Sequence, residues 1–160
     1  MTDFASCESP SGFTLPEIDV VIQHNAAVSL GDAFVIPADH LLNVGSVSNL
    51  LATSAAKKAG IVCVALNNYA ANKPGHYRIQ GICRAYMKSL SGSAIVRGMA
   101  MALTTVNDLD VDGPASINVG RWTAKAITEF AAGATGSTTP ALGLVELAGP
   151  PGLGNFASGT

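Results

Sequence analysis

Three aspartates at alternate positions form the sharpest chemical pattern in the sequence. Asp108, Asp110 and Asp112 precede a glycine, which matches the first half of a calcium-binding loop. The second half does not match, because the seventh loop position is Pro114 and the twelfth, normally a bidentate Glu, is Val119. We therefore predict no structural Ca²⁺ and interpret the segment as a solvent-facing edge strand entering a turn. A weak surface cation site is the alternative.

The histidines and cysteines lack the spacing that catalysis or metal ligation needs. His24, His40 and His76 lie in turn-like sequence, and no Gly-x-Ser-x-Gly motif supplies a nucleophile elbow. Cys63 and Cys83 lie within apolar runs, where cysteine serves as a small hydrophobe. The three cysteines contain no CxxC pair, so neither a disulfide scaffold nor a zinc site is indicated. We expect no catalytic residue, no metal and no cofactor, and hence a protein that is not an enzyme.

Residues 76–88, HYRIQGICRAYMK, show the strongest alternation in the chain. One face is small and apolar, and the other carries long, mostly polar side chains. Arg78, Arg84 and Lys88 form a basic row on the polar face. This row is either a solvated outer surface or a contact with a partner protein or sister subunit, because Arg and Tyr are enriched where interfaces gain energy.

Composition excludes several classes of protein. Nine Lys and Arg against eleven Asp and Glu give a net charge of −2, which argues against binding to a nucleic-acid backbone. The N-terminal residues lack the basic and apolar regions of a signal peptide, and the best apolar stretch, 94–106, is too short and too interrupted to cross a membrane. We expect a soluble protein assembled in a reducing cytoplasm, without nucleic-acid or membrane partners.

Strand signals dominate the middle of the sequence. Short β-rich runs are separated by Gly, Pro and Asn, and only 49–58 has a thin helical signal. This pattern predicts an all-β fold, a single β-barrel or β-sandwich of short antiparallel strands. The expected strands are 18–23, 33–36, 61–66, 76–88, 94–104, 116–119, 122–130 and 141–147.

Two segments of the sequence repeat. Residues 31–36 match 98–103, and Tyr-Ala-Ala-x-x-x-Gly at 69–75 matches Phe-Ala-Ala-x-x-x-Gly at 130–136. An aromatic residue followed six positions later by Gly between two strands is typical of a hairpin. We predict two related hairpin units that pack together into a closed or nearly closed barrel, which removes exposed strand edges.

The chain ends differ from the middle. Residues 1–16 are rich in Ser, Pro and Thr, and the C-terminal 149–160 has the same character. We predict an N-terminal arm (1–16), a β-domain (17–148) and a C-terminal tail (149–160), with flexible termini. Phe4, Phe13 and Leu15 are apolar anchors with which the arm would become ordered on a partner.

The organisation resembles that of small capsid decoration, or cement, proteins of tailed bacteriophages. The resemblance spans roughly 18–148 and lies in a Gly-Asp-apolar strand, Gly-initiated strands ending in Ala-rich turns, and a later repeat of this order. The segments that carry it are 31–36, 60–71, 78–84, 98–103, 120–127, 130–136 and 144–147.

This resemblance implies a non-enzymatic virion protein that stabilises the capsid. It would be made in the cytoplasm of the bacterial host, bind the major capsid protein on the outer capsid surface, and form a dimer or trimer. Phe4, Phe13, Leu15, Arg78, Arg84 and Lys88 are the expected contacts with capsid or sister subunit. A carbohydrate- or ligand-binding β-barrel is the first alternative, although aromatic residues, which usually line such pockets, make up only 6% of the chain. An enzyme whose site forms at a subunit interface is the second.

Overall fold

The structure is a computed structural model of the chain, and its described part contains ten strands and no helix. The predicted all-β class is therefore confirmed. The described residues are 8–9, 12–13, 16–36, 61–103, 107–111, 124–134, 136 and 139–148. In chain order the strands are β1 (Glu8–Ser9), β2 (Gly12–Phe13), β3 (Ile18–Gln23), β4 (Ala33–Ile36), β5 (Ile61–Ala65), β6 (Pro74–Lys88), β7 (Ala100–Leu103), β8 (Leu109–Asp110), β9 (Ala124–Ala126) and β10 (Ala141–Ala148).

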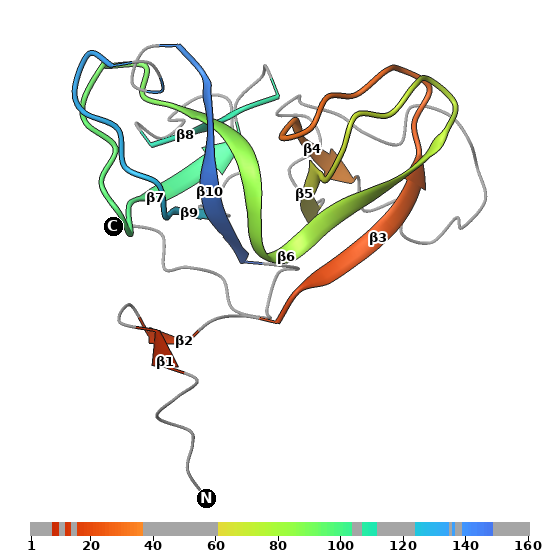
Figure 1. The fold of residues 1–160 in the computed structure, drawn as a ribbon, viewed down its shortest axis with the longest axis horizontal. Helices are drawn as coiled ribbons and strands as arrows, with labels where there is room; N and C mark the ends of the chain where they lie inside the picture. Colours follow the sequence, from red (N-terminus) through yellow and green to blue (C-terminus); the bar gives the residue numbers. More distant parts are fainter. Residues whose placement is uncertain are drawn as a thin grey trace, which may run out of the picture.

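Five of these strands close into a β-barrel (Figure 1). β10 pairs with β9 and with the C-terminal half of β6, β9 pairs with β7, and β7 pairs with β8. β8 then returns to the end of β6 and completes the ring. The pairing of β6 with β8 is parallel and the other pairings in the ring are antiparallel.

The long strand β6 belongs to two parts of the molecule. Its N-terminal half pairs with β3 on one side and with β5 on the other, and β5 pairs with β4. Midway along, Gly81 has a φ of +97°, which L-residues with a side chain rarely adopt. A Cβ there would come within 3.0 Å of the Glu17 Cα. Gly81 therefore permits the sharp bend of β6 seen at the bottom of Figure 1.

The two halves of β6 belong to two copies of one four-strand unit. The first unit consists of β3, β4, β5 and the N-terminal half of β6. The second consists of the C-terminal half of β6, β7, β9 and β10. In each unit the first strand pairs with the fourth, the fourth with the third, and the third with the second. The two related units predicted from the sequence are present.

The turn that precedes the second strand repeats in backbone detail. Gly31 and Gly98 have φ values of +89° and +88°. The Gly31 amide donates to the Ala65 carbonyl at 3.0 Å, and the Gly98 amide donates to the Ala126 carbonyl at 2.8 Å. The sequence match at 31–36 and 98–103 thus marks a turn in which glycine supplies the left-handed backbone.

The hairpin turn with the aromatic residue also repeats. A Cβ on Gly75 would lie 2.6 Å from the Tyr69 ring, and a Cβ on Gly136 would lie 2.6 Å from the Phe130 ring. In both units the aromatic ring therefore lies flat over a glycine six residues later, which explains why the motif keeps these two residue types.

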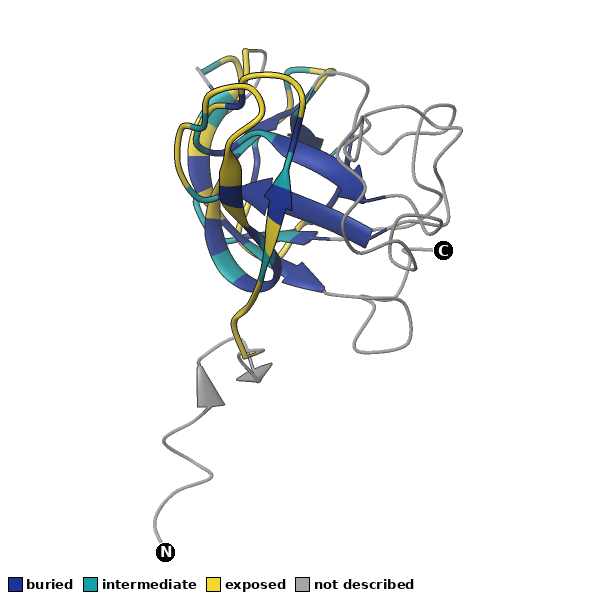
Figure 2. Ribbon diagram, turned by 90° about the vertical axis from the view of Figure 1, so that its right-hand side faces the viewer, coloured by how far each residue is buried: buried dark blue, intermediate teal, exposed yellow. Residues whose placement is uncertain are grey.

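The hairpin of β4 and β5 is buried on both faces, as the continuous apolar run 61–66 predicted (Figure 2). One face contributes Ala33, Val35, Val62 and Val64 to the core of the barrel. The other face contributes to a second core with β3 and the N-terminal half of β6. β4 and β5 therefore separate the two hydrophobic cores and contribute side chains to both.

Barrel closure differs from the prediction. We expected two hairpin units to close the barrel together, but the second unit closes with β8, a short strand between its second and third strands. β8 was also expected to be a solvent-facing edge, and this is wrong. Asp108 and Asp110 are each 2% exposed because β8 lies between β6 and β7. Asp112 lies outside the described residues.

Most expected strands are present with shifted ends. The predicted pairing of 61–67 with 76–87 occurs at Val64–Arg78 and Ala65–Tyr77. The predicted pairing of 122–130 with 141–147 occurs over Ala124–Ala126. The run 94–104 forms a strand only over Ala100–Leu103, because the turn at Gly98 interrupts it. The expected strand 116–119 and the helical signal at 49–58 lie outside the described residues.

Candidate protein-docking surface

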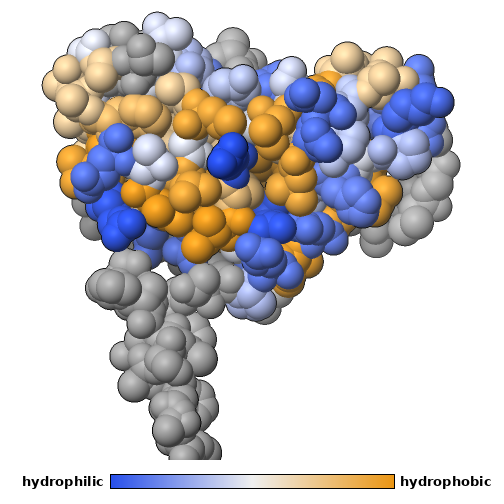
Figure 3. Space-filling view, in the orientation of Figure 1, coloured by the Kyte–Doolittle hydropathy of each residue, from blue (hydrophilic) through white to orange (hydrophobic). Residues whose placement is uncertain are grey.

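The outer face of β6 and β10 carries exposed apolar side chains. Antiparallel pairing places Leu142 opposite Tyr86 and Leu144 opposite Arg84 on this face. Leu142 is 36% exposed and Leu144 is 40% exposed, and Tyr86 is half-buried. We call Arg84, Tyr86, Leu142 and Leu144 the outer β6/β10 face. Figure 3, which views the molecule from the side where β6 and β10 lie in front, shows a continuous apolar area with a strongly hydrophilic centre.

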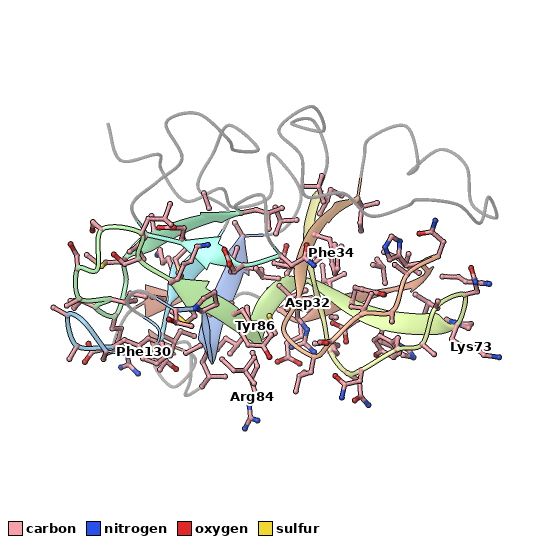
Figure 4. The ribbon with its side chains drawn as sticks, turned by 90° about the horizontal axis from the view of Figure 1, so that it is seen from above. Asp32, Phe34, Lys73, Arg84, Tyr86 and Phe130 are labelled. Atoms are coloured by element: carbon pink, nitrogen blue, oxygen red, sulfur yellow. The ribbon has the colours of Figure 1, made fainter. Side chains whose placement is uncertain are left out.

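Arg84 is the exposed cation of this face. Its side chain projects away from the sheet, on the same side as Tyr86 (Figure 4). No hydrogen bond or ion pair joins it to another described residue. An open hollow of about 230 Å³ lies beside it, lined by Arg84, Thr128, Leu142, Gly143 and Leu144.

Gly143, between the two exposed leucines of β10, is a buried residue that lines the hollow. Gly143 points inward, where a Cβ would come within 3.1 Å of the Thr128 Cβ and would collide with the Met87 sulfur. Thr128 closes one side of the hollow, and its hydroxyl oxygen accepts a hydrogen bond from the Leu144 amide at 2.8 Å. Its hydroxyl hydrogen is left to donate to another group.

Arg78 lies on the outward side of β6, as predicted, but its charge is compensated within the chain. Its guanidinium group contacts Asp19 at 2.6 Å and Glu17 at 2.8 Å, and it also donates to the Ile82 carbonyl. The hydrogen bond with Asp19 is the main cause that raises the pKa of Arg78. Only 12% of its side chain is exposed, so it presents little charge to a partner.

Lys88 is buried at the end of β6. Its Nζ lies 3.0 Å from the Asp108 Oδ2, with 10% of the lysine side chain and 3% of the aspartate side chain exposed. This ion pair joins β6 to the residue that precedes β8, so it stabilises the closure of the barrel. The predicted basic row is therefore three residues on one strand, of which Arg84 alone is exposed.

The predicted arm residues fall largely outside the described part of the chain. Phe4 and Leu15 lie outside it, and Phe13 is placed only as a member of β2, which pairs with β1. Their contact with a partner, and the domain boundaries at residues 16/17 and 148/149, stay predictions.

Leu142 and Leu144 are functional candidates that sequence reasoning missed. The signal was present in residues 141–148, ALGLVELA, where both alternating faces are largely apolar. Glu146 shares the alternating face of Leu142 and Leu144, and this charged residue was the signal that the face would point outward. In the structure Val145 and Leu147 fill the barrel core, so the two leucines face outward.

Cys63 and Cys83 are core residues, as expected. Cys63 and Cys83 are free thiols, and their exposed fractions are 0% and 6%. Burial raises the pKa of both thiols, that of Cys83 to about 12, so neither thiol ionises readily. Burial also lowers the pKa of His24, whose ring packs against Phe34.

Within the described ranges, no three His, Cys, Asp or Glu side chains gather as a metal-binding group. The same ranges hold no helix of the length and hydropathy needed to cross a bilayer. Comparison of the sequence with protein-family models finds no match, and comparison with curated proteins finds no significant similarity.

Proposed function

We propose that this protein is a structural virion protein that binds the outer surface of an assembled phage capsid and stabilises it, without enzymatic activity. The observation that carries the proposal is the outer β6/β10 face, an exposed apolar surface with one uncompensated arginine on a closed barrel. Exposed apolar area of this kind is typical of surfaces that bind other proteins. The resemblance in strand order and Gly-Ala-rich turns to phage cement proteins supports the choice of capsid as partner.

The proposed function requires only modest affinity at each binding site on the capsid and no reactive group. A ligand that binds only the assembled shell stabilises it by RT ln(1 + [L]/Kd), about 2.7 kcal/mol per site at a hundredfold excess over Kd. Repeated over a capsid lattice, modest contacts raise the free energy needed to open the shell. A small β-barrel with an exposed apolar face meets this requirement.

The alternatives have weaker support from the geometry. The hollow beside Arg84 is lined by no aromatic side chain, whereas pockets for sugars and small ligands usually are. The buried thiols have raised pKa values, which is the opposite of what nucleophilic catalysis requires. Neither observation favours a ligand-binding module or an enzyme.

The experiment is addition of purified protein to expanded capsids of the encoding phage that lack it. We expect saturable co-sedimentation with the capsids and a higher temperature of capsid opening. Deletion of residues 1–16 should weaken addition if the arm with Phe4, Phe13 and Leu15 also contacts the capsid. A protein that neither binds these capsids nor protects them against heat is not a cement protein.

A further inference from the structure

We infer that the outer β6/β10 face binds a carboxylate side chain, with apolar neighbours, on the surface of a different protein. The inference rests on the proposed function and names the chemistry of its partner surface. It assigns Arg84 as the charged contact and Leu142 and Leu144 as the apolar contacts.

The hollow beside Arg84 offers hydrogen-bond donors and no anionic side chain. Its five lining residues are one arginine, one threonine, two leucines and one glycine. The Arg84 guanidinium group donates in a planar fork that matches a carboxylate, and the Thr128 hydroxyl hydrogen is available because its oxygen already accepts from Leu144. A carboxylate would therefore find two donors side by side.

The surroundings of Arg84 make this charge costly to cover without an anion. Arg78 and Lys88 have carboxylate partners within the chain, but Arg84 has none among the described residues. A purely apolar partner would strip water from the guanidinium group and return no hydrogen bond. A partner that covers Leu142 and Leu144 must therefore bring a compensating carboxylate.

A second copy of this chain is a poor occupant for a symmetric contact. In a two-fold interface the same patch meets itself, and the acidic residue next to it along β10, Glu146, is half-buried and already interacts within the chain. The hollow holds no carboxylate to compensate either guanidinium group. Charge complementarity therefore points to a different protein, and under the proposed function this is the capsid surface.

The test compares Arg84→Glu with Arg97→Glu in capsid co-sedimentation. Arg97 is also exposed, but it lies in the turn before Gly98 and does not line the hollow. Because removing one member of a desolvated charge pair costs 2–5 kcal/mol, we expect Arg84→Glu to weaken binding at least about 30-fold. Arg97→Glu should bind within about threefold of the unmodified protein. Arg84→Gln separates loss of charge from repulsion and should also weaken binding, and Leu144→Ser tests the apolar contact.

Unchanged unfolding midpoints would show that all four variants fold. If the unmodified protein binds capsids and Arg84→Glu binds equally well, the inference is wrong while the proposed function stands. If Arg84→Glu instead changes the sedimentation coefficient of the free protein, the occupant is a second copy and the inference is also wrong.

A separate measurement covers the case in which the unmodified protein does not bind capsids and the proposed function fails. Methyl NMR signals of Leu142 and Leu144 are followed during titration with the blocked peptides Ac-Leu-Glu-Leu-NH2 and Ac-Leu-Gln-Leu-NH2. Saturable shifts with the Glu peptide, absent with the Gln peptide and in Arg84→Gln, would support the carboxylate site. Equal shifts with both peptides, or none, would overturn it.

Discussion

Charged residues of β6 have different roles although they share one side of the strand. Arg78 links β6 to β3 through Asp19, Lys88 links β6 to Asp108 immediately before β8, and Arg84 alone extends into solvent. The difference comes from what lies across from each residue. Arg78 is paired with Asp19 on β3, and Lys88 is paired with Asp110 on β8. Arg84 is paired with Leu144 on β10.

Removing one member of the buried Lys88–Asp108 pair should destabilise the barrel. We expect Lys88→Met to lower the free energy of unfolding by about 3–5 kcal/mol, because it leaves a buried carboxylate without its cation. The double variant Lys88→Met with Asp108→Leu should recover much of this loss. Urea unfolding followed by circular dichroism measures both, and equal stability of the single variant and the unmodified protein would contradict the role of the pair in closure.

His24 should make stability depend on pH. The side chain is 8% exposed, its Nδ1 has no hydrogen-bond partner among the described residues, and burial lowers its pKa from the ordinary 6.5. The unfolded chain therefore binds more protons than the folded chain just below pH 6.5, so stability rises with pH up to that value and is lost as the pH falls below it.

The measurement for His24 is the free energy of unfolding between about pH 5 and pH 7.5. The slope should be smaller in His24→Leu than in the unmodified protein. An identical slope in His24→Leu would assign the pH dependence to other groups.

The repeated hairpin turn is the element whose sequence and structure agree most closely. In both units an aromatic ring covers a glycine. In the first unit the centroid of the Tyr69 ring also lies 5.7 Å from the centroid of the Tyr77 ring. The Tyr69 hydroxyl donates to the His76 carbonyl at 3.2 Å. These contacts hold the ring in place, so it cannot easily move away from an added methyl group.

Gly75→Ala should therefore destabilise the protein by about 1–3 kcal/mol through overpacking. Gly75 has an ordinary φ, so backbone strain does not contribute. In a Tyr69→Ala background the same substitution should cost much less, since the ring that it meets is gone. A double-mutant cycle by thermal unfolding measures the coupling, and additive effects would show that the ring does not press on Gly75.

At the scale of the whole molecule, the β4–β5 hairpin couples the two units. Its two faces belong to different cores, and β6 runs through both units. Loss of either core would expose one face of β4 and β5, so neither unit buries all of its apolar side chains by itself. Figure 2 shows these strands buried within the body of the molecule.

We therefore expect one cooperative unfolding transition. Phe34→Ala, in the core of the first unit, and Leu147→Ala, in the barrel core, should each lower the same transition, by about 3–5 and 2–5 kcal/mol respectively. Calorimetry and hydrogen exchange measure the number of transitions. Two separate transitions, each sensitive to one substitution, would show that the units are independent.

Several features were determined by the sequence alone. The strands β3, β4, β5 and β10, the apolar face of β6 and the repeat of the glycine turns all follow from local rules. Side chains alternate with a period of two, and left-handed or crowded backbone positions require glycine. The inward placement of Tyr77, Cys83 and Met87 was predicted in this way and is confirmed.

Tertiary structure decided what local rules leave open. Locally, Asp108–Asp112 has the pattern of a solvated edge strand. In the structure Asp108 is buried because β8 lies between β6 and β7, and Lys88, twenty residues earlier in the chain, supplies the cation that compensates its charge. Closure of the barrel by β8 depends on a parallel pairing between distant segments of the chain. The outer β6/β10 face thus arises from strand pairing, since Arg84 and Leu144 lie sixty residues apart and become neighbours only in the folded sheet.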